Sequence, residues 1–289
     1  MSGPRSGADL EGAFSDVAFA ERAVYLPAPD ALVVADLHVG RGEASAVSLP
    51  LGERADLVDR LGALLDRFEP EEVVVAGDVV HTFDRVTDRA LGTLNALRDR
   101  CEATGATLEL VAGNHDAALA SAWDGPVGEE AVLNGSGEPH ADAADSRRTV
   151  VCHGHEAPAA AADRSSTRPD RYVIGHVHPT IEIEGDRHPC FLRGAGTYRG
   201  ADVLALPAFT RLAAGVPVND AERAGLDSPL LDDPAALAPV VYDAGGTDGA
   251  DGEDGADGED GADGEDGADG GDAGAALRFP PLGEFGGLL

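Results

Sequence analysis

Seven of the nine histidines lie in five short segments, three of which also carry aspartate or asparagine and one of which carries cysteine. The segments read ADLHVG, AGDVVH, AGNHD, CHGH and IGHVHP, and they begin at residues 35, 76, 112, 152 and 174. Mixed imidazole, carboxylate and amide ligands suit manganese or iron, with zinc as an alternative. Any one of these histidines could instead be an ordinary core or surface residue. Five such segments have no structural reason to occur together, so the set predicts a metal centre.

Short valine-rich runs precede or contain these segments. They cover residues 31–36, 71–78, 107–114, 149–154 and 171–176. Between the first three runs, residues 51–68 and 83–105 repeat apolar side chains at intervals of three and four, which is typical of amphipathic helices. Alternating strands and helices indicate an α/β protein. The polar segments then fall at the carboxyl ends of the strands, where ligands bind in open α/β sheets.

The pattern changes after residue 176. Residues 180–194 and 201–215 alternate or run apolar around turns, with no helical pattern between them. This favours a mostly antiparallel second half. Two β layers with helices outside them would accommodate both halves.

The spacing within the segments supports a shared site. Asp36 and His38 are two residues apart, as are His176 and His178, so in extended chain each pair projects to one side. Asp78 ends the central run and could bridge two ions roughly 3.5 to 4 Å apart, as in two-metal hydrolases.

In their order, the segments resemble the signature of the calcineurin-like metallophosphoesterases, D-x-H, G-D-x-x-D/H, G-N-H-D/E, H and G-H-x-H, over residues 31–180. The resemblance implies an α/β fold in which a two-layer β-sandwich is flanked by helices, in four layers α/β/β/α. It also implies two divalent ions, with manganese expected first and iron or zinc as alternatives. One ion would take Asp36, His38, Asp78 and His178, and the other Asp78, Asn114, His153 and His176.

The same resemblance implies roles beside the metals. His115 would stabilise the phosphate or protonate the leaving group, and Asp116 would orient its ring. Arg41, His81 and His155 are candidates for contacts with the substrate. Arg41 and His81 could instead have only a local structural role, and His155 could instead support the ligand His153. The expected chemistry is attack on phosphorus by a hydroxide that the two ions generate from water.

A narrower resemblance lies outside the metal motifs. Residues 188–194, HPCFLRG, and 202–219, DVLALPAFTRLAAGVPVN, are similar to archaeal phosphoesterases related to the SbcD nuclease and to bacterial ligase-associated DNA damage response endonucleases. This implies a nuclease of the DNA-repair type, with single-stranded DNA as a candidate substrate.

Two other functions stay open. One is a phosphodiesterase of cyclic or other small nucleotides, and the other is a scaffold that binds metal and a protein partner without catalysis. A nucleic-acid substrate would need arginines beside the metals, and the candidates are Arg41, Arg164, Arg168 and Arg171. A homodimer is a further candidate assembly.

Charge at first argues against nucleic acid, because the net charge is −32 and phosphate binding relies on a basic surface. The chain has no lysine, and its 53 acidic residues are spread well beyond the twelve in residues 247–272. Such a surface indicates a salt-loving organism. At molar salt the Debye length is only about 3 Å, so the surface repulsion would be screened.

The cysteines and the apolar runs bear on the compartment. Cys101, Cys152 and Cys190 show no Cys-x-x-Cys spacing, which favours a reducing compartment. The first residues carry no apolar signal core, and no run reaches the 18 apolar residues of a membrane helix. We therefore expect a cytoplasmic protein with no membrane partner.

The organisation expected is one domain over residues 1–289 with an acidic insertion at 246–274. GADGED occurs three times from residue 249, without an apolar side chain larger than alanine, so we expect this insertion to be disordered. Both flanking stretches, 238–245 and 275–285, have the pattern of strands, which places it in a hairpin loop. Calcium binding is an alternative, but the acidic spacing lacks the glutamate at position twelve of a calcium loop.

Overall fold

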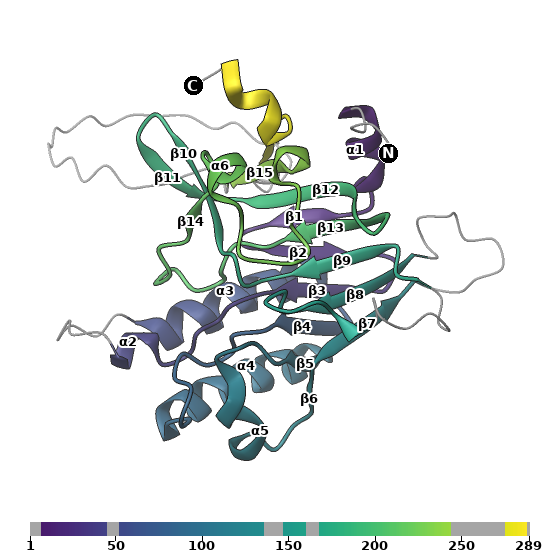
Figure 1. The fold of residues 1–289 in the computed structure, drawn as a ribbon. Helices are drawn as coiled ribbons and strands as arrows, with labels where there is room; N and C mark the ends of the chain where they lie inside the picture. Colours follow the sequence, from purple (N-terminus) through teal and green to yellow (C-terminus); the bar gives the residue numbers. More distant parts are fainter. Residues whose placement is uncertain (1–6, 45–51, 136–146, 160–167, 244–274, 288–289) are drawn as a thin grey trace, which may run out of the picture.

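The computed structural model describes residues 7–44, 52–135, 147–159, 168–243 and 275–287. Two large β-sheets pack face to face (Figure 1). One has six strands in the order β1-β2-β3-β4-β5-β6, and the other has seven in the order β16-β15-β12-β13-β9-β8-β7. Helices flank this sandwich, which confirms the α/β architecture predicted from the sequence.

The first sheet contains the first three predicted strands and adds three others. Its members are β1 (Ala18–Ala20), β2 (Ala23–Leu26), β3 (Ala31–Val34), β4 (Glu72–Ala76), β5 (Thr107–Val111) and β6 (Val127–Gly128). β3 to β6 are parallel, whereas β1 and β2 pair antiparallel at the edge. The parallel strands bring their carboxyl ends to one edge of the sheet.

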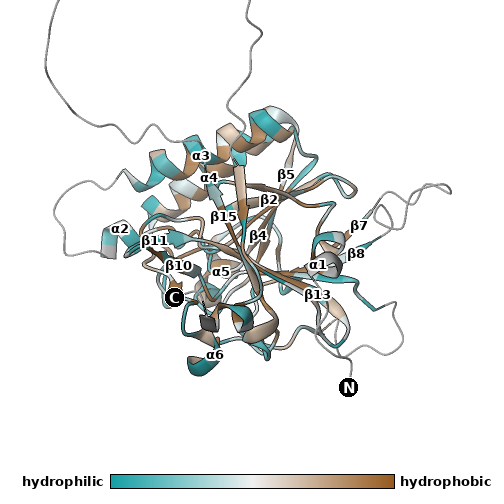
Figure 2. Ribbon diagram, turned by 90° about the horizontal axis from the view of Figure 1, so that it is seen from above, coloured by the Kyte–Doolittle hydropathy of each residue, from teal (hydrophilic) through white to brown (hydrophobic). Residues whose placement is uncertain are grey.

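Two helices cover the outer face of the first sheet. They are α3 (Glu53–Phe68) and α4 (Asp88–Thr104), within the two stretches predicted as amphipathic helices. In Figure 2 both helices carry hydrophilic as well as hydrophobic residues, while the strands beneath them are mainly hydrophobic. The Thr87 side chain caps α4 by accepting a hydrogen bond from Ala90 N, and Gly105 ends it in a left-handed conformation. The apolar contacts join Leu61, Leu65, Leu94 and Leu97 to Leu32, Val34, Val73 and Val75.

The second sheet is mixed. Its strands are β7 (Glu130–Asn134), β8 (Arg148–Cys152), β9 (Arg171–Ile174), β12 (Phe191–Tyr198), β13 (Ala201–Ala205), β15 (Ala238–Asp243) and β16 (Ala275–Arg278). Antiparallel pairs predominate after residue 176, as predicted, but β13 pairs parallel with β9. Buried residues from both sheets, such as Val33, Val74, Val173 and Leu204, form the core between them.

Short elements cover the outer face of the second sheet. A three-stranded sheet of β10 (Pro179–Ile183), β11 (Asp186–Pro189) and β14 (Val216–Pro217) packs there with α6 (Ala221–Ala224). The 3-10 helices η3 (Pro234–Ala236) and η4 (Leu282–Gly287) complete this layer. Its helices are therefore much shorter than those of the opposite layer. The other short helices are α1 (Gly7–Ala13), α2 (Arg41–Ala44), η1 (Asp116–Ala118) and α5 (Leu119–Ala122).

The strands β15 and β16 form an antiparallel pair in which Asp243 is opposite Ala275. The two stretches that flank the acidic repeat therefore pair as predicted, while the predicted insertion at 246–274 lies outside the described residues. All three cysteines are buried and free. Within the described part of the chain, none of the helices has the length and apolarity needed to cross a bilayer.

Candidate metal centre

The five histidine-bearing segments follow β3, β4, β5, β8 and β9. Beyond the strand ends, the first two segments stay joined by backbone hydrogen bonds. Asp36 N donates to Gly77 O at 3.1 Å, and His38 N donates to Asp78 O at 2.8 Å. Gly175 N donates to His153 O at 3.1 Å and joins the last two segments in the same way. Four of the five segments are thus joined in pairs just beyond the ends of their strands.

One cluster brings together Asp36, His38, Asp78 and His178, whose ligand atoms lie within 4.8 Å of one another. His178 Nε2 lies 3.3 Å from Asp36 Oδ1 and 3.3 Å from His38 Nε2. His38 Nε2 lies 3.7 Å from Asp78 Oδ2. Atoms bound about 2.1 Å from one ion lie roughly 3.0 to 3.4 Å apart. The cluster therefore has the dimensions of a coordination shell.

A second cluster centres on His153 Nε2. This atom lies 3.0 Å from Asn114 Oδ1, 3.2 Å from His176 Nδ1 and 3.3 Å from Asp78 Oδ1. Asp78 thus directs one carboxylate oxygen to each cluster, Oδ2 to the first and Oδ1 to the second. All seven residues expected to bind metal lie together in these two clusters.

Burial sets the protonation of the imidazoles. It lowers the pKa of His38 to about 3 and that of His153 to about 4, even though Asp36 acts in the opposite direction on both. For His178, burial also acts to lower the pKa, but hydrogen bonding to Asp36 and the charge of Asp36 raise it above the usual value. Metal ligation needs neutral imidazole. His38 and His153 therefore have lone pairs available near neutral pH, which fits a metal site.

The two carboxylates differ. Burial raises the pKa of Asp78 to about 7, and the charge of Asp36 adds to that effect. For Asp36, burial again acts upward, but its hydrogen bond and charge interactions with His178 bring the pKa below the usual value. A buried carboxylate that resists ionisation is stabilised by a nearby cation.

Five of the seven candidate ligands have left-handed backbone. The φ angles are 55° at Asp36, 45° at His38, 45° at Asp78, 70° at His176 and 48° at His178. The two-residue spacing was predicted to act through extended chain, and this explanation is wrong: the side chains are brought together by tight turns instead. Such φ values cost free energy for residues other than glycine, and they concentrate at functional sites.

Three glycines leave room for the clustered side chains. A Cβ on Gly77 would lie 2.2 Å from His153 Nδ1, and one on Gly113 would lie 2.3 Å from Asp78 Oδ1. A Cβ on Gly175 would lie 2.7 Å from an oxygen of Asp36. The glycines of the sequence motifs are thus required by close packing around the candidate ligands.

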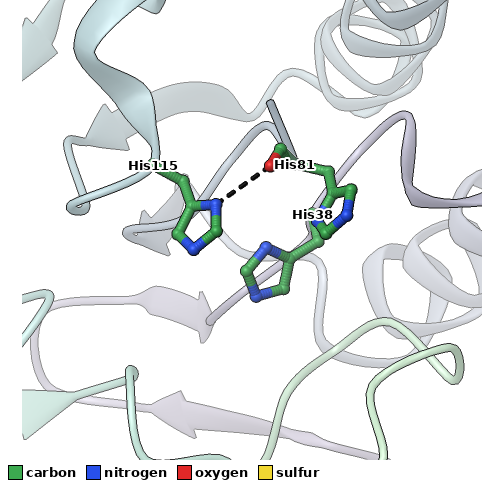
Figure 3. Close-up of side chains that lie close together, drawn as sticks. All are labelled: His38, His81 and His115. Carbon is green, nitrogen blue, oxygen red and sulfur yellow. Dashed lines mark hydrogen bonds between the residues drawn. The ribbon is translucent and has the colours of Figure 1, made fainter. Parts of the chain in front are cut away.

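His115 lies beside the first cluster with His38 and His81 (Figure 3). Its Nδ1 lies 2.9 Å from the carbonyl oxygen of His81, and its Nε2 lies 3.8 Å from Asp78 Oδ2. Phe83 stacks on the His115 ring, with centroids 3.9 Å apart. Phe83 was not among the residues predicted from the sequence, although it stands only two residues after His81.

Asp116 was expected to orient the His115 ring, but its hydrogen bonds go elsewhere. Its carboxylate accepts hydrogen bonds from the backbone amides of Val79, Val80 and Gly113, at 2.8 to 3.0 Å. It therefore joins the loop after β5 to the loop after β4, while the carbonyl of His81 orients the ring. A buried carboxylate with three amide donors is typical of a structural connection.

The three expected substrate contacts surround the centre. Arg41 N donates to His38 O, and burial together with the charge of Arg41 lowers the pKa of His81. The His155 ring lies 5.1 Å from that of His153, between centroids. His155 also lines a cavity of about 390 Å³ whose wall includes Glu129, Glu130 and Glu156.

Arg171 was also expected beside the metals, but it lies away from the candidate centre. It is 1% exposed, pairs with Asp16 at 2.5 Å and donates to Ala13 O, so that prediction is wrong. Its position at the start of β9 places it at the opposite edge from His176. Arg168 is exposed, and Arg164 lies outside the described residues.

Comparison with known proteins identifies the family. The model of the calcineurin-like phosphoesterase superfamily domain matches residues 30–193. Among solved structures, nuclease MPE of Pseudomonas putida is 25% identical, with 76% of this chain and 88% of that chain covered and a TM-score of 0.48. The phosphoesterase Yfce of E. coli is 15% identical, with 73% and 90% covered and a TM-score of 0.37. No curated protein matches the sequence.

The matched range contains all seven candidate ligands, from Asp36 after β3 in the first sheet to His178 after β9 in the second. Proteins of this kind use divalent metals, and the clusters provide neutral imidazoles, an amide and carboxylates at coordination distances. The chain therefore belongs to the calcineurin-like phosphoesterase superfamily and is a hydrolase that acts on phosphoesters.

Proposed function

We propose that the protein hydrolyses phosphodiester bonds as a nuclease of the DNA-repair type, with two divalent ions. The observation that carries the proposal is the position of Asp78, which directs one oxygen to each cluster. A shared carboxylate of this kind holds two ions in two-metal hydrolases. This position supports a site for two ions over a site for one.

The two ions would have separate ligand sets. Manganese is the first candidate, with iron or zinc as alternatives, because the donors are imidazole, amide and carboxylate. When bound, the ions supply positive charge to the phosphate oxygens and a nucleophile derived from water. The first set is Asp36, His38, Asp78 and His178, and the second is Asp78, Asn114, His153 and His176.

His115 is proposed to act on the substrate. A carbonyl oxygen accepts only from a protonated nitrogen, so the contact with His81 O fixes the proton on Nδ1. Nε2 is then the atom that gains or loses a proton and that faces the centre. In its protonated form it donates to a phosphate oxygen or to the leaving oxygen. General acid catalysis of this kind contributes about 10² to 10⁴ in rate.

Other residues would support this arrangement. Phe83 holds the His115 ring from one side, and Asp116 fixes the loops that carry His115 and Asp78. Arg41 and His81 are proposed to contact the phosphate from the side of the first cluster. His155 is proposed to act beside the second cluster, near His153 and His176.

The test is hydrolysis of bis(p-nitrophenyl) phosphate and of a fluorescent single-stranded DNA, with manganese, in molar KCl. His115→Ala is compared with His188→Ala, which changes a histidine on β11 outside the centre. We expect the wild type and His188→Ala to cleave both substrates. His115→Ala should lose about 10² to 10⁴ in rate while binding normal amounts of manganese by elemental analysis.

Other outcomes point elsewhere. Cleavage of the small diester alone would favour a phosphodiesterase of cyclic or small nucleotides. Stoichiometric metal without any cleavage would favour a binding scaffold. Equal loss of metal and activity in His115→Ala would make His115 a ligand and contradict its proposed role.

A further inference from the structure

A cavity of about 210 Å³ lies next to His178, on the side of the first cluster. We call it the arginine pocket. At about 30 Å³ per water molecule, it has room for a small hydrated anion. Its wall combines three cations with a buried hydroxyl and small residues, among them Arg22, His178, Thr180, Arg187, Arg211 and Gly215.

Arg22 is the most enclosed of the three arginines. It lies in the turn between β1 and β2, and its Nη1 donates to Ala208 O at 2.8 Å and to Thr210 O at 3.1 Å. Burial and the positive charges of Arg60 and Arg211 together lower its pKa to about 10, against the charges of Glu21 and Asp56, which act to raise it. Arg22 remains protonated at neutral pH in a crowded cationic environment, which an anion would relieve.

The other two arginines have carboxylate partners at the surface. Arg187 pairs with Glu182 at 2.9 Å, and Arg211 pairs with Glu21 at 2.5 Å and Asp56 at 3.4 Å. Side chains in both pairs with glutamate are at least one-third exposed. Exposed pairs of this kind are weak. A phosphate can therefore compete with these carboxylates for the guanidinium groups.

Thr180 provides an independent sign of a ligand. Its residue is 6% exposed, and its Oγ1 is buried without a hydrogen-bond partner among the described residues. Gly215 packs so closely that a Cβ there would lie 2.4 Å from Thr180 Cγ2. Buried hydroxyls normally have a partner, and an exception needs an explanation. A phosphate oxygen in the pocket would supply that partner.

The two other described cavities that include a candidate ligand carry acidic side chains. The cavity beside His155 is lined by Glu129, Glu130 and Glu156, and a third cavity beside His176 is lined by Asp227. In a chain with a net charge of −32, an extended polyanion is attracted only where cations are concentrated. Among the described cavities at the centre, the arginine pocket meets this requirement.

We propose that the arginine pocket binds a backbone phosphate of a nucleic acid next to the phosphate held at the metal centre. Arg22, Arg187 and Arg211 would provide its positive charge, and Thr180 Oγ1 would donate a hydrogen bond. This inference rests on the proposed function and narrows it. The preferred substrate has at least two phosphates in one chain, so an oligonucleotide is favoured over a cyclic mononucleotide.

The experiment measures the ratio of kcat/KM for a short oligothymidylate to kcat/KM for bis(p-nitrophenyl) phosphate. Thr180→Val preserves shape and removes only the hydroxyl. A hydrogen bond to a charged group corresponds to about a tenfold change, so we expect the ratio to fall about tenfold in Thr180→Val and in Arg187→Gln. Glu182→Gln removes the partner of Arg187 and should raise the ratio.

Thr197→Val is the matched control for Thr180→Val. Thr197 Oγ1 is also buried without a partner, but it lies near the β12–β13 turn. Because β13 runs parallel to β9, that turn is at the edge opposite the carboxyl end of β9. Thr197→Val should leave the ratio unchanged. The thermal midpoint of each variant verifies that it is folded.

The outcomes separate the two claims. One outcome is that wild type cleaves both substrates while Thr180→Val and Arg187→Gln keep the wild-type ratio. In that case phosphate binding in the arginine pocket is overturned and the proposed function stands. If wild type cleaves neither, the proposed function fails. Binding of fluorescent oligothymidylate to metal-free protein, followed by anisotropy, then decides: weaker binding by Thr180→Val than by Thr197→Val supports the pocket, and equal binding overturns it.

Discussion

Asp78 occupies the point where the two clusters meet, and its chemistry differs from that of Asp36. Burial raises the pKa of Asp78 to about 7, whereas contacts with His178 hold the pKa of Asp36 below its usual value. In metal-free protein near neutral pH, Asp78 is therefore partly protonated. Metal ligation requires its carboxylate, so binding should release a proton from this residue.

Asp78→Asn should disconnect the two clusters. It removes the charge that both ions would share, so we expect no more than one ion per chain in elemental analysis. Loss of an outer-shell partner already costs 10- to 100-fold in metal affinity, and loss of a shared ligand should lower activity by more than about 100-fold. Asp227→Asn is the control, because Asp227 lies 3.9 Å from His176 Nε2 but is fully exposed. Two ions retained by Asp78→Asn would contradict the bridging role.

The clustered residues were expected from sequence because the order of their motifs resembles the family signature and because residue types are read directly from the chain. The contacts of Asp116 and Arg171 could not. Asp116 accepts from amides on a different loop, and Arg171 pairs with Asp16, which is distant in sequence. A polar side chain next to a motif gives no local signal of which distant backbone it will meet.

At the scale of elements, the turns after the strands are the features that create the site. Five of the seven candidate ligands have left-handed backbone, and glycines pack closely against His153, Asp78 and Asp36. Valine-rich runs predicted β3, β4, β5, β8 and β9 because buried strands are apolar on both faces. The alanine-rich β1 and short β2 give no comparable pattern. The parallel pairing of β13 with β9 joins strands that are distant in sequence, so neither strand predicts it by itself.

Gly77→Ala should damage the centre more than the fold. Its φ of 81° is unfavourable for alanine, and the new Cβ would lie 2.2 Å from His153 Nδ1. Gly105→Ala, with φ 87° and no atom within 4 Å, has the same backbone cost without a clash. We expect both variants to lose stability by about 1 to 3 kcal/mol in urea unfolding. Only Gly77→Ala should also lose manganese; equal metal binding by the two would refute the packing argument.

Glu109 on β5 should make stability depend on pH. Burial raises its pKa to about 7 from 4.5, and a hydrogen bond and charge interaction with Glu72 add to the shift. The folded state therefore holds a proton between pH 4.5 and 7 that the unfolded state releases. Stability from this group is lost as the pH rises through that window. Glu109→Gln should remove that contribution.

Urea unfolding at pH 5 and pH 7.5 tests the Glu109 prediction. The variant should gain stability relative to wild type mainly at pH 7.5. Glu102→Gln, on the surface of α4, serves as the control and should follow wild type at both pH values. A parallel pH dependence in wild type and Glu109→Gln would exclude Glu109 as the source.

At the scale of the molecule, the centre joins the two sheets. Asp36, Asp78 and Asn114 follow strands of the first sheet, while His153 and His176 follow strands of the second. Ions bound there would connect the layers across the sandwich. The α/β architecture was accessible from sequence because its alternation repeats along the chain, whereas the single-domain organisation over residues 1–289 stays a prediction.

Metal should therefore raise the thermal midpoint. A ligand present at 1,000 times its dissociation constant adds about 4 kcal/mol to folding stability, and each kcal/mol shifts the midpoint by about 2 to 4 °C in a chain of 150 to 250 residues. We expect manganese to raise the midpoint of chelator-treated wild type by about 10 °C and to raise that of Asp78→Asn by clearly less. Equal shifts in both proteins would show that manganese acts elsewhere.

The pairing of β15 with β16 has a consequence for how the chain can vary. Asp243 and Ala275 are direct partners, so the polypeptide leaves the sheet and returns to it at adjacent positions. A connection that starts and ends at these two positions keeps the strand pairing, whether it is a two-residue turn or an inserted domain. The reason is that the entropic cost of closing a loop grows only slowly with its length. This hairpin is thus a site that tolerates insertions, because added residues need not alter the register between β15 and β16.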